Sequence, residues 1–378
     1  MKILFNFLDY NHNEVRKEKN TYGGIGYYRI VKPAQFIEGH EKDVFGKEAV
    51  HFGRNNLENW TNVFKKYDAV WMNYGYGDQN LASIIFAAQQ SKKKLIMDVD
   101  DNYLDIPESN DLHEQFKEKK KDRAFLSAAL SFCDTIVVST EPLKEKLFEH
   151  FKKVHGMEKN IVVIPNMNDI RDWEFTPVEK TGDIGDKLVI GYTGSTSHKD
   201  DFQMIAPVLA KLMKKYKNLH LEIVGMVKKT DVADYFGSYG FTQESLERIS
   251  LLPATLTFKE YPEYLSKLKW DIGIAPLVDT AFTRAKSHIK WMEYATMKIP
   301  CVASRVYPYF MELCGRQTIE DGVTGMLCKP HEWEEKLEKL ILDKDLRKKI
   351  GESAYEFVKK EWQYDSKLVT ELANKALS

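Results

Sequence analysis

Short apolar runs that alternate with helical patterns constrain the fold of this chain more than any other feature of its sequence. In the first half, such runs have the length and composition of buried parallel strands, and 81–92 and 141–154 have helical spacing. The predicted strands are 2–8, 68–72, 94–98, 134–139 and 160–164. This succession predicts βαβ units, in which helices cover the faces of a parallel sheet.

The same alternation restarts after a polar stretch, 166–187, that contains proline and glycine. The strands predicted there are 187–194, 219–225, 254–258, 271–277 and 300–304. A chain of 378 residues is too long for one ordinary core and suits two domains of about 150–200 residues each. We therefore predict an α/β protein with two doubly wound parallel-sheet domains. Ligands of such sheets bind at the carboxyl ends of the strands, so the site is expected in the cleft between the domains.

Composition and charge exclude several classes of protein. The 55 basic and 56 acidic residues give a net charge of −1, so no overall field attracts the chain to nucleic acid or to an anionic membrane. The four cysteines are widely spaced and include no C-x-x-C pair, which argues against a zinc site or a disulfide framework. No segment has the core of a signal peptide or the ~20 apolar residues of a membrane span. We therefore expect a cytoplasmic protein.

An unusual set of cations opens the helix that is predicted from residue 287 and that Pro300 ends. Lys286, His288 and Lys290 stand in or beside its first turn. A helix N-terminus carries free N–H groups and a partial positive charge, so each lysine there destabilises the helix by roughly a few tenths of a kcal/mol. The pattern indicates a missing anion, and a diphosphate is the best candidate.

Lys286, Lys290 and Glu293 follow an i, i+4, i+7 spacing, which would place them on one stripe of this helix. A plain surface pair between Lys290 and Glu293 is the alternative, but such pairs are more stable in the reverse order. Glu293 lies too far along the helix to reach a phosphate, so we expect it to accept hydrogen bonds from sugar hydroxyls. His198 and His288 have no second ligand at metal spacing and are expected to donate to phosphate or backbone.

Two strands of the second half end in glycine signals. The segment GYTGSTSHKDD ends a strand at Gly194 and Ser195 and then enters a helix, with Asp200 or Asp201 as the predicted N-cap. Small residues there let the backbone approach a ligand closely, and the helix N-terminus offers N–H donors to phosphate. A tight turn without a ligand is an equally good interpretation. Gly225, at the end of LHLEIVG, is a weaker signal of the same kind.

Two signals of the first half are candidates for the opposite side of the cleft. The segment YGGIGYYRI is not a dinucleotide fingerprint, because it lies well beyond the first strand and Arg29 takes the place of the third glycine. After another strand, the segment 96–107 carries the carboxylates of Asp98, Asp100 and Asp101. Clustered carboxylates serve as bases, hydroxyl acceptors or metal ligands. Loop capping by aspartate is the alternative without a function.

The segment 113–132 predicts an amphipathic helix with a basic run at its start. Its apolar side would consist of Phe125, Ala128, Ala129 and Phe132. Such a helix could contact an anionic surface, an acceptor or the inner face of a membrane. A solvated helix face is the favoured interpretation, because Glu118 and Asp122 interrupt the positive charge.

These motifs resemble those of the GT-B glycosyltransferases, particularly the retaining enzymes of family 4 (glycosyl transferases group 1), over nearly the whole chain. The likeness is strongest in the second half, where the order and spacing of the motifs are similar to those of the donor domain. The motifs are GYTGSTSHKDD, LHLEIVG, DIGIAPL, KSHIKWMEYATMKIPCVAS and DGVTGML. VIPNMND is similar to the start of the interdomain linker, and GGIGYYR, GHEKDVFG and CDTIVVSTEPLKEKL carry a looser likeness.

The resemblance implies the GT-B architecture, in which two Rossmann-like domains face each other across a cleft. Residues 1–170 would form the acceptor-binding domain and 171–355 the nucleotide-sugar-binding domain. Residues 356–378 would form a helix that crosses back to the first domain.

The resemblance also implies roles for single residues. Glu293 matches the second glutamate of the family's paired motif and would bind the nucleotide ribose, whereas Ala285 stands in the place of the first glutamate. Donor-binding residues would be Gly194, Ser195, His198, Lys199, Gly225, Lys286, Ser287, Lys290 and Glu293. Acceptor-binding residues would be Gly24, Gly26 and Arg29. Many relatives have a histidine after the strand that ends in DVDD, so the catalytic candidates here are Asp98, Asp100 and Asp101, with no metal.

The implied reaction transfers a sugar from a nucleotide diphosphate sugar, with a UDP-sugar favoured, to an acceptor hydroxyl with retention of configuration. The donor is a co-substrate, and no further cofactor is expected. The acceptor stays open between a glycan, a lipid-linked glycan, a small metabolite and a modified nucleic-acid base. A sugar-nucleotide epimerase of similar fold and a non-catalytic nucleotide-sugar-binding protein are the alternative functions.

Overall fold

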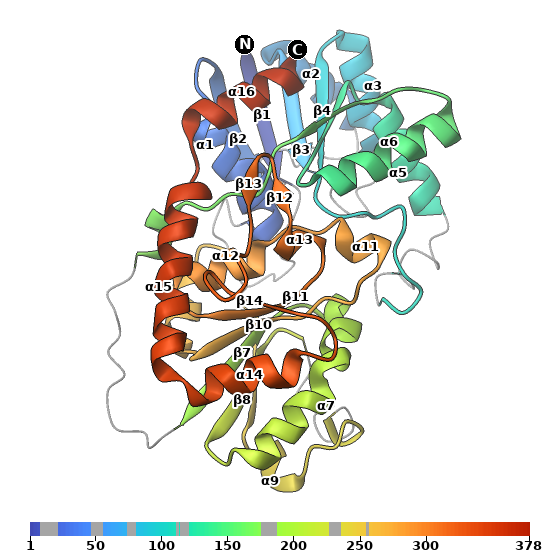
Figure 1. Ribbon diagram of the computed structural model, residues 1–378. Coiled ribbons are helices and arrows are strands. Elements are labelled where there is room, and N and C mark those ends of the chain that lie inside the picture. Colours follow the sequence, from blue (N-terminus) through green and yellow to red (C-terminus); the bar gives the residue numbers. More distant parts are fainter. Residues whose placement is uncertain are drawn as a thin grey trace.

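The computed structural model describes residues 1–7, 22–46, 56–73, 81–110, 113, 121–174, 187–226, 236–254 and 257–378. Two layered units lie one above the other, each with a parallel sheet between helices (Figure 1). We call them the N-terminal unit, which contains β1 to β6, and the C-terminal unit, which contains β7 to β14. The predicted α/β class with two parallel sheets is confirmed.

The N-terminal unit contains six parallel strands in the order β2-β1-β3-β4-β5-β6. The strands are β1 (Lys2–Phe7), β2 (Glu41–Gly46), β3 (Ala69–Asn73), β4 (Lys94–Val99), β5 (Thr135–Val138) and β6 (Asn160–Val163). The helices are η1 (Gly26–Val31), α1 (Lys32–Phe36), α2 (Asn56–Lys66), α3 (Leu81–Ser91), α5 (Lys121–Phe132), α6 (Glu141–His155) and η3 (Ile170–Trp173). The five predicted strands are confirmed. We did not predict β2 as a strand, because this edge strand is polar and lacks an apolar run.

The C-terminal unit contains a second sheet in the order β14-β11-β10-β7-β8-β9. Its strands are β7 (Leu188–Thr193), β8 (Leu219–Val224), β9 (Ile249–Leu252), β10 (Ile272–Ala275), β11 (Cys301–Ser304) and β14 (Met326–Cys328). A small hairpin consists of β12 (Glu312–Leu313) and β13 (Arg316–Gln317). The helices are η4 (Thr196–His198), α7 (Lys199–Lys215), α9 (Gln243–Leu246), α10 (Tyr261–Leu268), α11 (Ala281–Arg284), α12 (Ile289–Thr296), α13 (Tyr307–Phe310), α14 (Trp333–Leu342) and α15 (Lys344–Glu361). The last helix, α16 (Ser366–Leu377), lies against the N-terminal sheet.

One strand prediction in the C-terminal unit was wrong. The edge strand is β9, which pairs with β8 from Leu221 opposite Ile249, and the described part of 254–258 belongs to no strand. The sequence misled because β9, ISLL, is only four residues long and is interrupted by the exposed Ser250, so it is a weaker strand signal than 254–258. The backbone N–H of Phe258 instead donates to the carbonyl of Tyr22 in the N-terminal unit at 2.9 Å. This segment therefore joins the two units.

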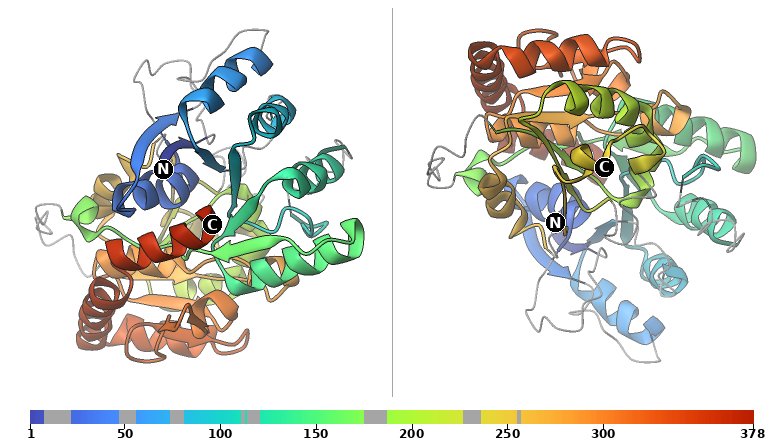
Figure 2. Two further views of the ribbon diagram at one scale, coloured as in Figure 1. Left: turned by 90° about the horizontal axis from the view of Figure 1, so that it is seen from above. Right: turned by 90° about the horizontal axis from the view of Figure 1, so that it is seen from below.

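The last two helices lead from the C-terminal unit back to the N-terminal unit. The helix α15 packs on α12 and α14, and α16 packs on β4, β5, β6 and α1 (Figures 1 and 2). At the crossing, the N–H of Asn168 donates to the carbonyl of Trp362 at 2.8 Å, and that of Tyr364 donates to the carbonyl of Asn168 at 2.9 Å. The two segments that connect the units are thus hydrogen-bonded to each other.

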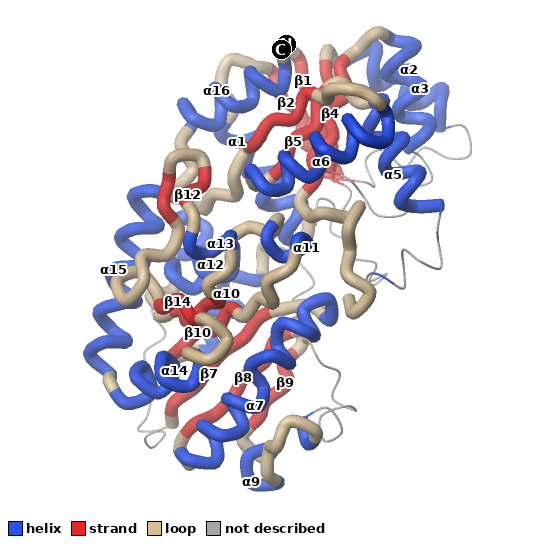
Figure 3. The backbone as a smooth tube through the Cα atoms, turned by 45° about the vertical axis from the view of Figure 1, so that its right-hand side comes forward, coloured by secondary structure: helices blue, strands red, loops and turns tan. Residues whose placement is uncertain are grey.

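Both sheets have cores on their two faces, as parallel sheets require. The strands form two separate groups with helices around each (Figure 3). One apolar cluster continues from the first unit into the second and contains Tyr27, Tyr28, Phe258 and Trp362. In the described part of the chain, no helix has the length and apolar character that crossing a membrane requires.

The helix predicted at 113–132 is described as α5 from Lys121, and 114–120 lie outside the described residues. Its buried face contains Leu126, Ala129 and Leu130, whereas Phe125 and Phe132 are 40% and 56% exposed. The predicted common apolar side for Phe125, Ala129 and Phe132 was therefore wrong. Leu126 and Leu130 fill the place next to α3 and α6 and turn both phenylalanines outward.

Candidate active site

A cavity of about 550 Å³ lies between the two units, a size typical of sites for small molecules. Most of the predicted site residues line it. From the predicted set, the lining contains Gly24, Arg29, Asp100, Asp101, Gly194, Ser195, His198, Gly225, Lys286, Ser287, Lys290 and Glu293. Asp98, Lys199 and Gly26 are not part of the lining. Most of the predicted site residues therefore lie in the cleft between the two units, where the two-sheet pattern predicts the site.

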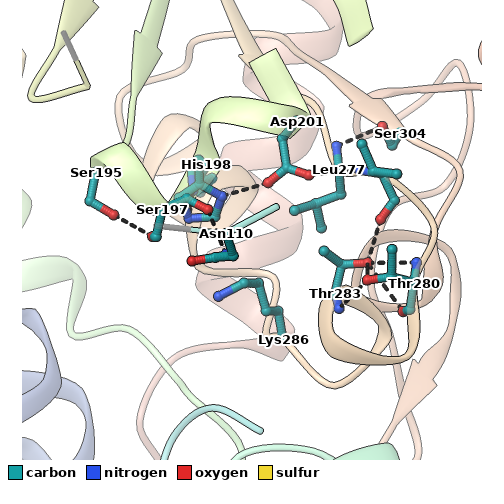
Figure 4. Close-up of polar contacts among 12 residues, drawn as sticks. Asn110, Ser195, Ser197, His198, Asp201, Leu277, Thr280, Thr283, Lys286 and Ser304 are labelled. Carbon is teal, nitrogen blue, oxygen red and sulfur yellow. Dashed lines mark hydrogen bonds and ion pairs between the residues drawn. The ribbon is translucent and has the colours of Figure 1, made fainter. Parts of the chain in front are cut away.

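The helix that carries Lys290 and Glu293 begins later than predicted. Thr280 caps the separate short helix α11, and α12 starts only at Ile289, with His288 as an N-cap that makes no side-chain capping bond (Figure 4). Lys286 lies in the turn between these helices. The predicted common helical stripe was therefore wrong for Lys286, although Lys286, Lys290 and Glu293 all line the cavity.

Both lysines have partners at the cavity. Lys286 Nζ lies 2.7 Å from Asp101 Oδ2, in an ion pair that joins the C-terminal unit to the N-terminal unit. Lys290 Nζ lies 3.1 Å from His198 Nε2. Burial, and then the nearby charge of Lys286, lowers the pKa of Lys290 to about 8. The cavity thus holds two cationic side chains, and the charged form of Lys290 is destabilised by its surroundings.

Glu293 is clamped between tyrosines from both units. The hydroxyl of Tyr28 in η1 donates to Oε1 at 3.1 Å, and the hydroxyl of Tyr261 in α10 donates to Oε2 at 3.0 Å. Glu293 is 5% exposed, and burial raises its pKa to about 7. Each carboxylate oxygen retains a further lone pair, so the group can still accept from a ligand hydroxyl.

The two glycine turns lie against each other. Gly194 donates its N–H to the carbonyl of Val224 at 3.0 Å, and a side chain at Gly225 would meet the carbonyl of Gly194 at 2.9 Å. Gly225 also has a φ of +86°, which favours glycine. A side chain at Gly194 would meet the hydroxyl of Tyr192 at 2.6 Å. Packing alone therefore requires both glycines, and both also form part of the cavity wall.

The helix after the first glycine turn is capped differently from the prediction. His198 is the N-cap of α7, and its side chain makes no capping bond, so the predicted cap at Asp200 or Asp201 was wrong. Asp201 is buried and accepts from the backbone N–H of Val278 at 2.7 Å. Its other oxygen lies 2.7 Å from His198 Nδ1 (Figure 4). Lys199 is exposed on this helix.

The other histidine has no contact with the cavity. His288 is completely buried, and its ring centroid lies 3.9 Å from that of Trp362. Burial lowers the pKa of His288 to about 3. The expectation that His288 donates to a phosphate or to the backbone was therefore wrong. The ring packs on the crossing segment away from the cavity, and neither ring nitrogen has a hydrogen-bond partner among the described residues.

On the N-terminal side, Arg29 and Asp98 form a buried ion pair. Arg29 Nε and Nη2 donate to the two oxygens of Asp98 at 2.7 and 3.1 Å, and both side chains are buried. Arg29 Nη1 also donates to the carbonyl of Ile164 and to Asn166 Oδ1. Because Asp98 faces Arg29 and lies behind the cavity wall, we correct its assignment from a reacting group to a partner that orients Arg29.

The next two carboxylates are on the wall itself. Asp100 Oδ1 accepts from the hydroxyl of Tyr103 at 2.8 Å, and Asp101 pairs with Lys286. Burial, and then the charge of Asp101, raises the pKa of Asp100. A carboxyl group with a raised pKa can accept or release a proton near neutral pH, which is a property of general acids and bases.

Ala285, which replaces a motif glutamate, does not face the cavity. It is completely buried in a core cluster of the N-terminal unit, and its carbonyl accepts from Thr140 Oγ1 at 2.8 Å. Any carboxylate contact to a donor sugar must therefore come from a position other than 285. In this structure, Asp100 and Asp101 are the carboxylates next to Lys286 on the wall.

Sequence reasoning missed several residues of the wall. Tyr28, Tyr261, Phe258 and Asn166 are examples, and Asn166 Nδ2 donates to Ser287 Oγ at 2.9 Å across the cleft. Aromatic residues are usual in cores, so Tyr261 and Phe258 cannot be distinguished from packing residues in the sequence. Tyr28 and Asn166 belong to the motifs GGIGYYR and VIPNMND, which could have marked them. Tyr28 also lies in the π-helical turn η1, a rare element that often marks functional sites.

Within the described ranges, no three or more His, Cys, Asp or Glu side chains are grouped as a metal site requires. The carboxylates on the cavity wall are instead paired with Tyr28, Tyr261, Tyr103 and Lys286.

Two parallel-sheet units with a cavity between them have the architecture of the GT-B fold, and comparison with known proteins agrees on the fold. Residues 187–343 match the model of the family described as "Glycosyl transferases group 1". The resemblance of the second half of the chain to that family is thereby confirmed. No curated protein matches the sequence.

Several solved structures share the fold over most or all of this chain. HepE of Anabaena, solved in complex with UDP and glucose, has 15% identity and a TM-score of 0.64, with 100% of this chain and 99% of that chain covered. Sucrose-phosphate synthase of Thermosynechococcus elongatus has 11% identity and a TM-score of 0.62, with 99% and 98% covered. TarM of S. aureus has 16% identity and a TM-score of 0.59, with 86% and 59% covered. At these identities the likeness concerns the fold, and it confirms the predicted GT-B architecture.

Proposed function

We propose that this protein is a glycosyltransferase that moves a sugar from a UDP-sugar to an acceptor hydroxyl with retention of configuration. The observation that carries the proposal is the convergence of Lys286, Lys290 and Glu293 on one cavity, inside the segment that matches the family model. Two cations suit a diphosphate, and a carboxylate about one helical turn further along suits a ribose.

The proposed division of labour follows the two units. Residues 171–355 would hold the nucleotide sugar, residues 1–170 would hold the acceptor, and 356–378 would return the chain to the first domain. The contacts of α16 with β4, β5 and β6 support the last assignment. We propose a cytoplasmic location, for which the reduced cysteines give support.

The lysines would act on the leaving group. Negative charge develops on the diphosphate as the bond to the sugar breaks, and positioned cations stabilise it without a metal ion. Gly194 and Ser195 bring the backbone to the same part of the wall, and His198 borders it. Contacts across the cleft, such as Lys286 with Asp101, would exclude water from the reacting groups.

The acceptor would lie on the opposite wall. Gly24 leaves room there, because a side chain at this position would meet nothing closer than Phe258 at 3.9 Å. Asp100 and Asp101 are the candidates for binding or deprotonating the acceptor hydroxyl, and Arg29 lies beside them. For the acceptor we keep four candidates: a glycan, a lipid-linked glycan, a small metabolite and a modified nucleic-acid base.

UDP is the favoured nucleotide because several proteins of the same fold were solved with UDP or a UDP-sugar. HepE was solved with UDP and glucose and with UDP-glucose, and the pneumococcal O-GlcNAc transferase GtfA was solved with UDP and GlcNAc. These ligands belong to those proteins, and the shared fold supports testing the same nucleotide first.

The test is a panel of UDP-, GDP-, ADP- and TDP-sugars, scored by thermal shift and by release of the nucleoside diphosphate. We expect the UDP-sugar to stabilise the protein most and to be hydrolysed slowly without an acceptor. Product analysis by NMR would then give the anomeric configuration after transfer, and inversion would contradict the retaining assignment. Absence of binding by every donor would contradict the proposal as a whole.

The same panel separates the two alternatives. An epimerase would convert the nucleotide sugar to its epimer without any added acceptor. A non-catalytic binding protein would bind tightly and give neither transfer nor hydrolysis, and the buried Ala285 in place of a motif glutamate is the observation that favours this alternative.

A further inference from the structure

Three side chains form a continuous hydrogen-bonded line that ends in the cavity. Asp201 Oδ2 lies 2.7 Å from His198 Nδ1, and His198 Nε2 lies 3.1 Å from Lys290 Nζ. Figure 4 shows Asp201 beside the ring of His198. His198 and Lys290 line the cavity, whereas Asp201 is not part of its lining. Asp201 therefore touches no ligand space and can act on the cavity only through the other two.

The carboxylate of Asp201 is fixed at both oxygens. Oδ1 accepts from the backbone N–H of Val278 at 2.7 Å, and the residue is 4% exposed. Val278 belongs to the loop after β10, so the carboxylate ties α7 to the neighbouring strand end. With Oδ1 occupied by this N–H, Oδ2 is left facing His198 Nδ1 and can only accept a proton from it while the carboxylate is ionised.

The contact between His198 and Lys290 requires the same direction of hydrogen bonding. An ammonium group has donors only, so His198 Nε2 must supply a lone pair to Lys290. Burial and the charges of Lys290 and Lys286 hold the pKa of His198 well below its usual range, which keeps the ring neutral. Both neighbours therefore require the same neutral ring, with its proton on Nδ1.

We propose that Asp201 is a positioning residue that holds His198 in the Nδ1–H tautomer, so that Nε2 keeps the ammonium of Lys290 aimed at the diphosphate subsite. The tautomer follows from the three side chains alone, and only its consequence for the donor rests on the proposed function. A histidine free to take the other tautomer would direct an N–H at the ammonium and displace it.

Asp201→Asn is the discriminating variant. The amide oxygen can keep the bond from Val278, and the amide NH₂ then faces His198 Nδ1 and can only donate to it. The ring must in response carry its proton on Nε2. Asp200→Asn is the matched control, because it removes the neighbouring carboxylate of the same helix turn and leaves this line of contacts intact.

The first readout is a two-dimensional ¹⁵N spectrum of the full-length protein with labelled histidine, in which His198→Gln identifies the signals of His198. In the unmodified protein we expect a protonated Nδ1 and an unprotonated Nε2, and in Asp201→Asn the reverse. A protonated Nε2 or a charged ring in the unmodified protein would overturn the proposal without need of any Asp201 variant, as would an unchanged tautomer in Asp201→Asn.

The second readout is calorimetric affinity for inorganic diphosphate, UDP and uridine. Asp201→Asn should weaken diphosphate and UDP binding about tenfold or more and leave uridine binding nearly unchanged, while Asp200→Asn should match the parent. Equal losses for uridine and diphosphate would indicate a structural defect and overturn the positioning role. If the parent binds none of these probes, the proposed function fails, and the spectrum still decides the tautomer.

Discussion

At the scale of the residue, the charge of Lys290 decides how the cavity treats an anion. Its ammonium donates to the neutral ring of His198 and lies near the like charge of Lys286. Glu293 attracts it electrostatically, but its carboxylate oxygens accept hydrogen bonds from Tyr28 and Tyr261. The ion pair of Lys290 with Glu293, the plain interpretation of their spacing, is therefore not the arrangement described.

Replacing Lys290 by Met keeps the apolar stem and removes the charge. Because burial lowers the folded-state pKa of Lys290 from 10.5 to about 8, its protonation opposes folding as the pH falls from the first value to the second, and the destabilisation is complete below about pH 8. Lys290→Met should therefore be as stable as the parent or slightly more stable when unliganded. It should lose roughly 10–100-fold in diphosphate affinity, the equivalent of one charge-assisted hydrogen bond, while uridine affinity falls much less.

Thermal unfolding and calorimetry measure these effects, and Lys267→Met, on the exposed face of α10, is the control. A destabilised variant that binds diphosphate normally would show that the lysine is structural and that the donor assignment of this wall is mistaken.

Asp100 is the residue whose loss should separate transfer from donor binding. Asp100→Asn keeps the shape and removes the proton acceptor, so we expect kcat for transfer to fall roughly 100-fold or more, as for loss of a general base. UDP affinity should stay nearly unchanged, because Asp100 belongs to the N-terminal unit, whereas the residues proposed to bind the diphosphate belong to the C-terminal unit. Asp105→Asn, on the exposed part of the same loop, should retain both properties. A large loss of UDP affinity in Asp100→Asn would place this carboxylate on the donor side.

At the scale of the element, the helix α16 brings the chain back to the N-terminal unit. Val369, Ala373, Ala376 and Leu377 form its buried face, and Asp365 caps its N-terminus by accepting from the N–H of Leu368 at 2.6 Å. The helix contacts three strands of a sheet that was formed by the first 163 residues of the chain. It therefore covers part of the first core.

Val369→Asp tests this packing by burying a charge without a partner. We expect a loss of roughly 3–5 kcal/mol of stability, because the carboxylate must be desolvated or the helix must detach. Lys367→Asp changes an exposed residue of the same helix and should stay within about 0.5 kcal/mol of the parent. Chemical denaturation of both variants measures the difference, and equal stabilities would contradict the docking of α16.

At the scale of the whole molecule, a residue of the N-terminal unit affects the pKa of a carboxyl group in the C-terminal unit. The hydroxyl of Tyr28 in the N-terminal unit donates to Glu293 in the C-terminal unit, which favours the ionised carboxylate. Burial holds the pKa of Glu293 at about 7 and that of Lys290 at about 8. Glu293 is ionised above the first value, and Lys290 is protonated below the second. Affinity for UDP-glucose should therefore be bell-shaped in pH, with its maximum between them.

Tyr28→Phe should shift one limb of that profile. Without the hydroxyl, the ionised form of Glu293 loses a donor, so its pKa rises further and the ascending limb moves to higher pH. UDP-glucose affinity should fall several-fold at pH 7 and recover at higher pH. Tyr67→Phe removes a tyrosine bond to Asp43 within the N-terminal unit and should leave the profile unchanged. Calorimetry across the pH range measures both, and an unmoved limb in Tyr28→Phe would disconnect Glu293 from donor binding.

Metal independence is also a property of the whole molecule. We expect transfer to survive excess EDTA, because Lys286 and Lys290 supply the positive charge at the diphosphate. Assays with and without EDTA, and with Mg²⁺ or Mn²⁺ added back, measure this. Complete loss that either metal restores would mean that Asp100 or Asp101 holds a cation against the diphosphate.

The sequence by itself determined the α/β class, nine of the strands as predicted, and most of the candidate site residues that line the cavity. Strand patterns and glycine turns depend on neighbouring residues, so they can be predicted from short segments of the sequence. The cation at Lys290 could be recognised for a similar reason, since charge at a helix start conflicts with the helix dipole wherever the helix lies. Lys286 lies in the turn before α12, so this argument does not apply to it.

Only the tertiary structure decided which of these residues face the cavity. Asp98 is turned to Arg29, His288 is packed on Trp362, and Ala285 is buried in the other unit's core. Glu293 meets Tyr28 across a sequence separation of 265 residues. The periodicity of the sequence cannot predict such contacts, because they depend on how two separately formed units pack against each other. They also depend on which polar groups need a hydrogen-bond partner after that packing.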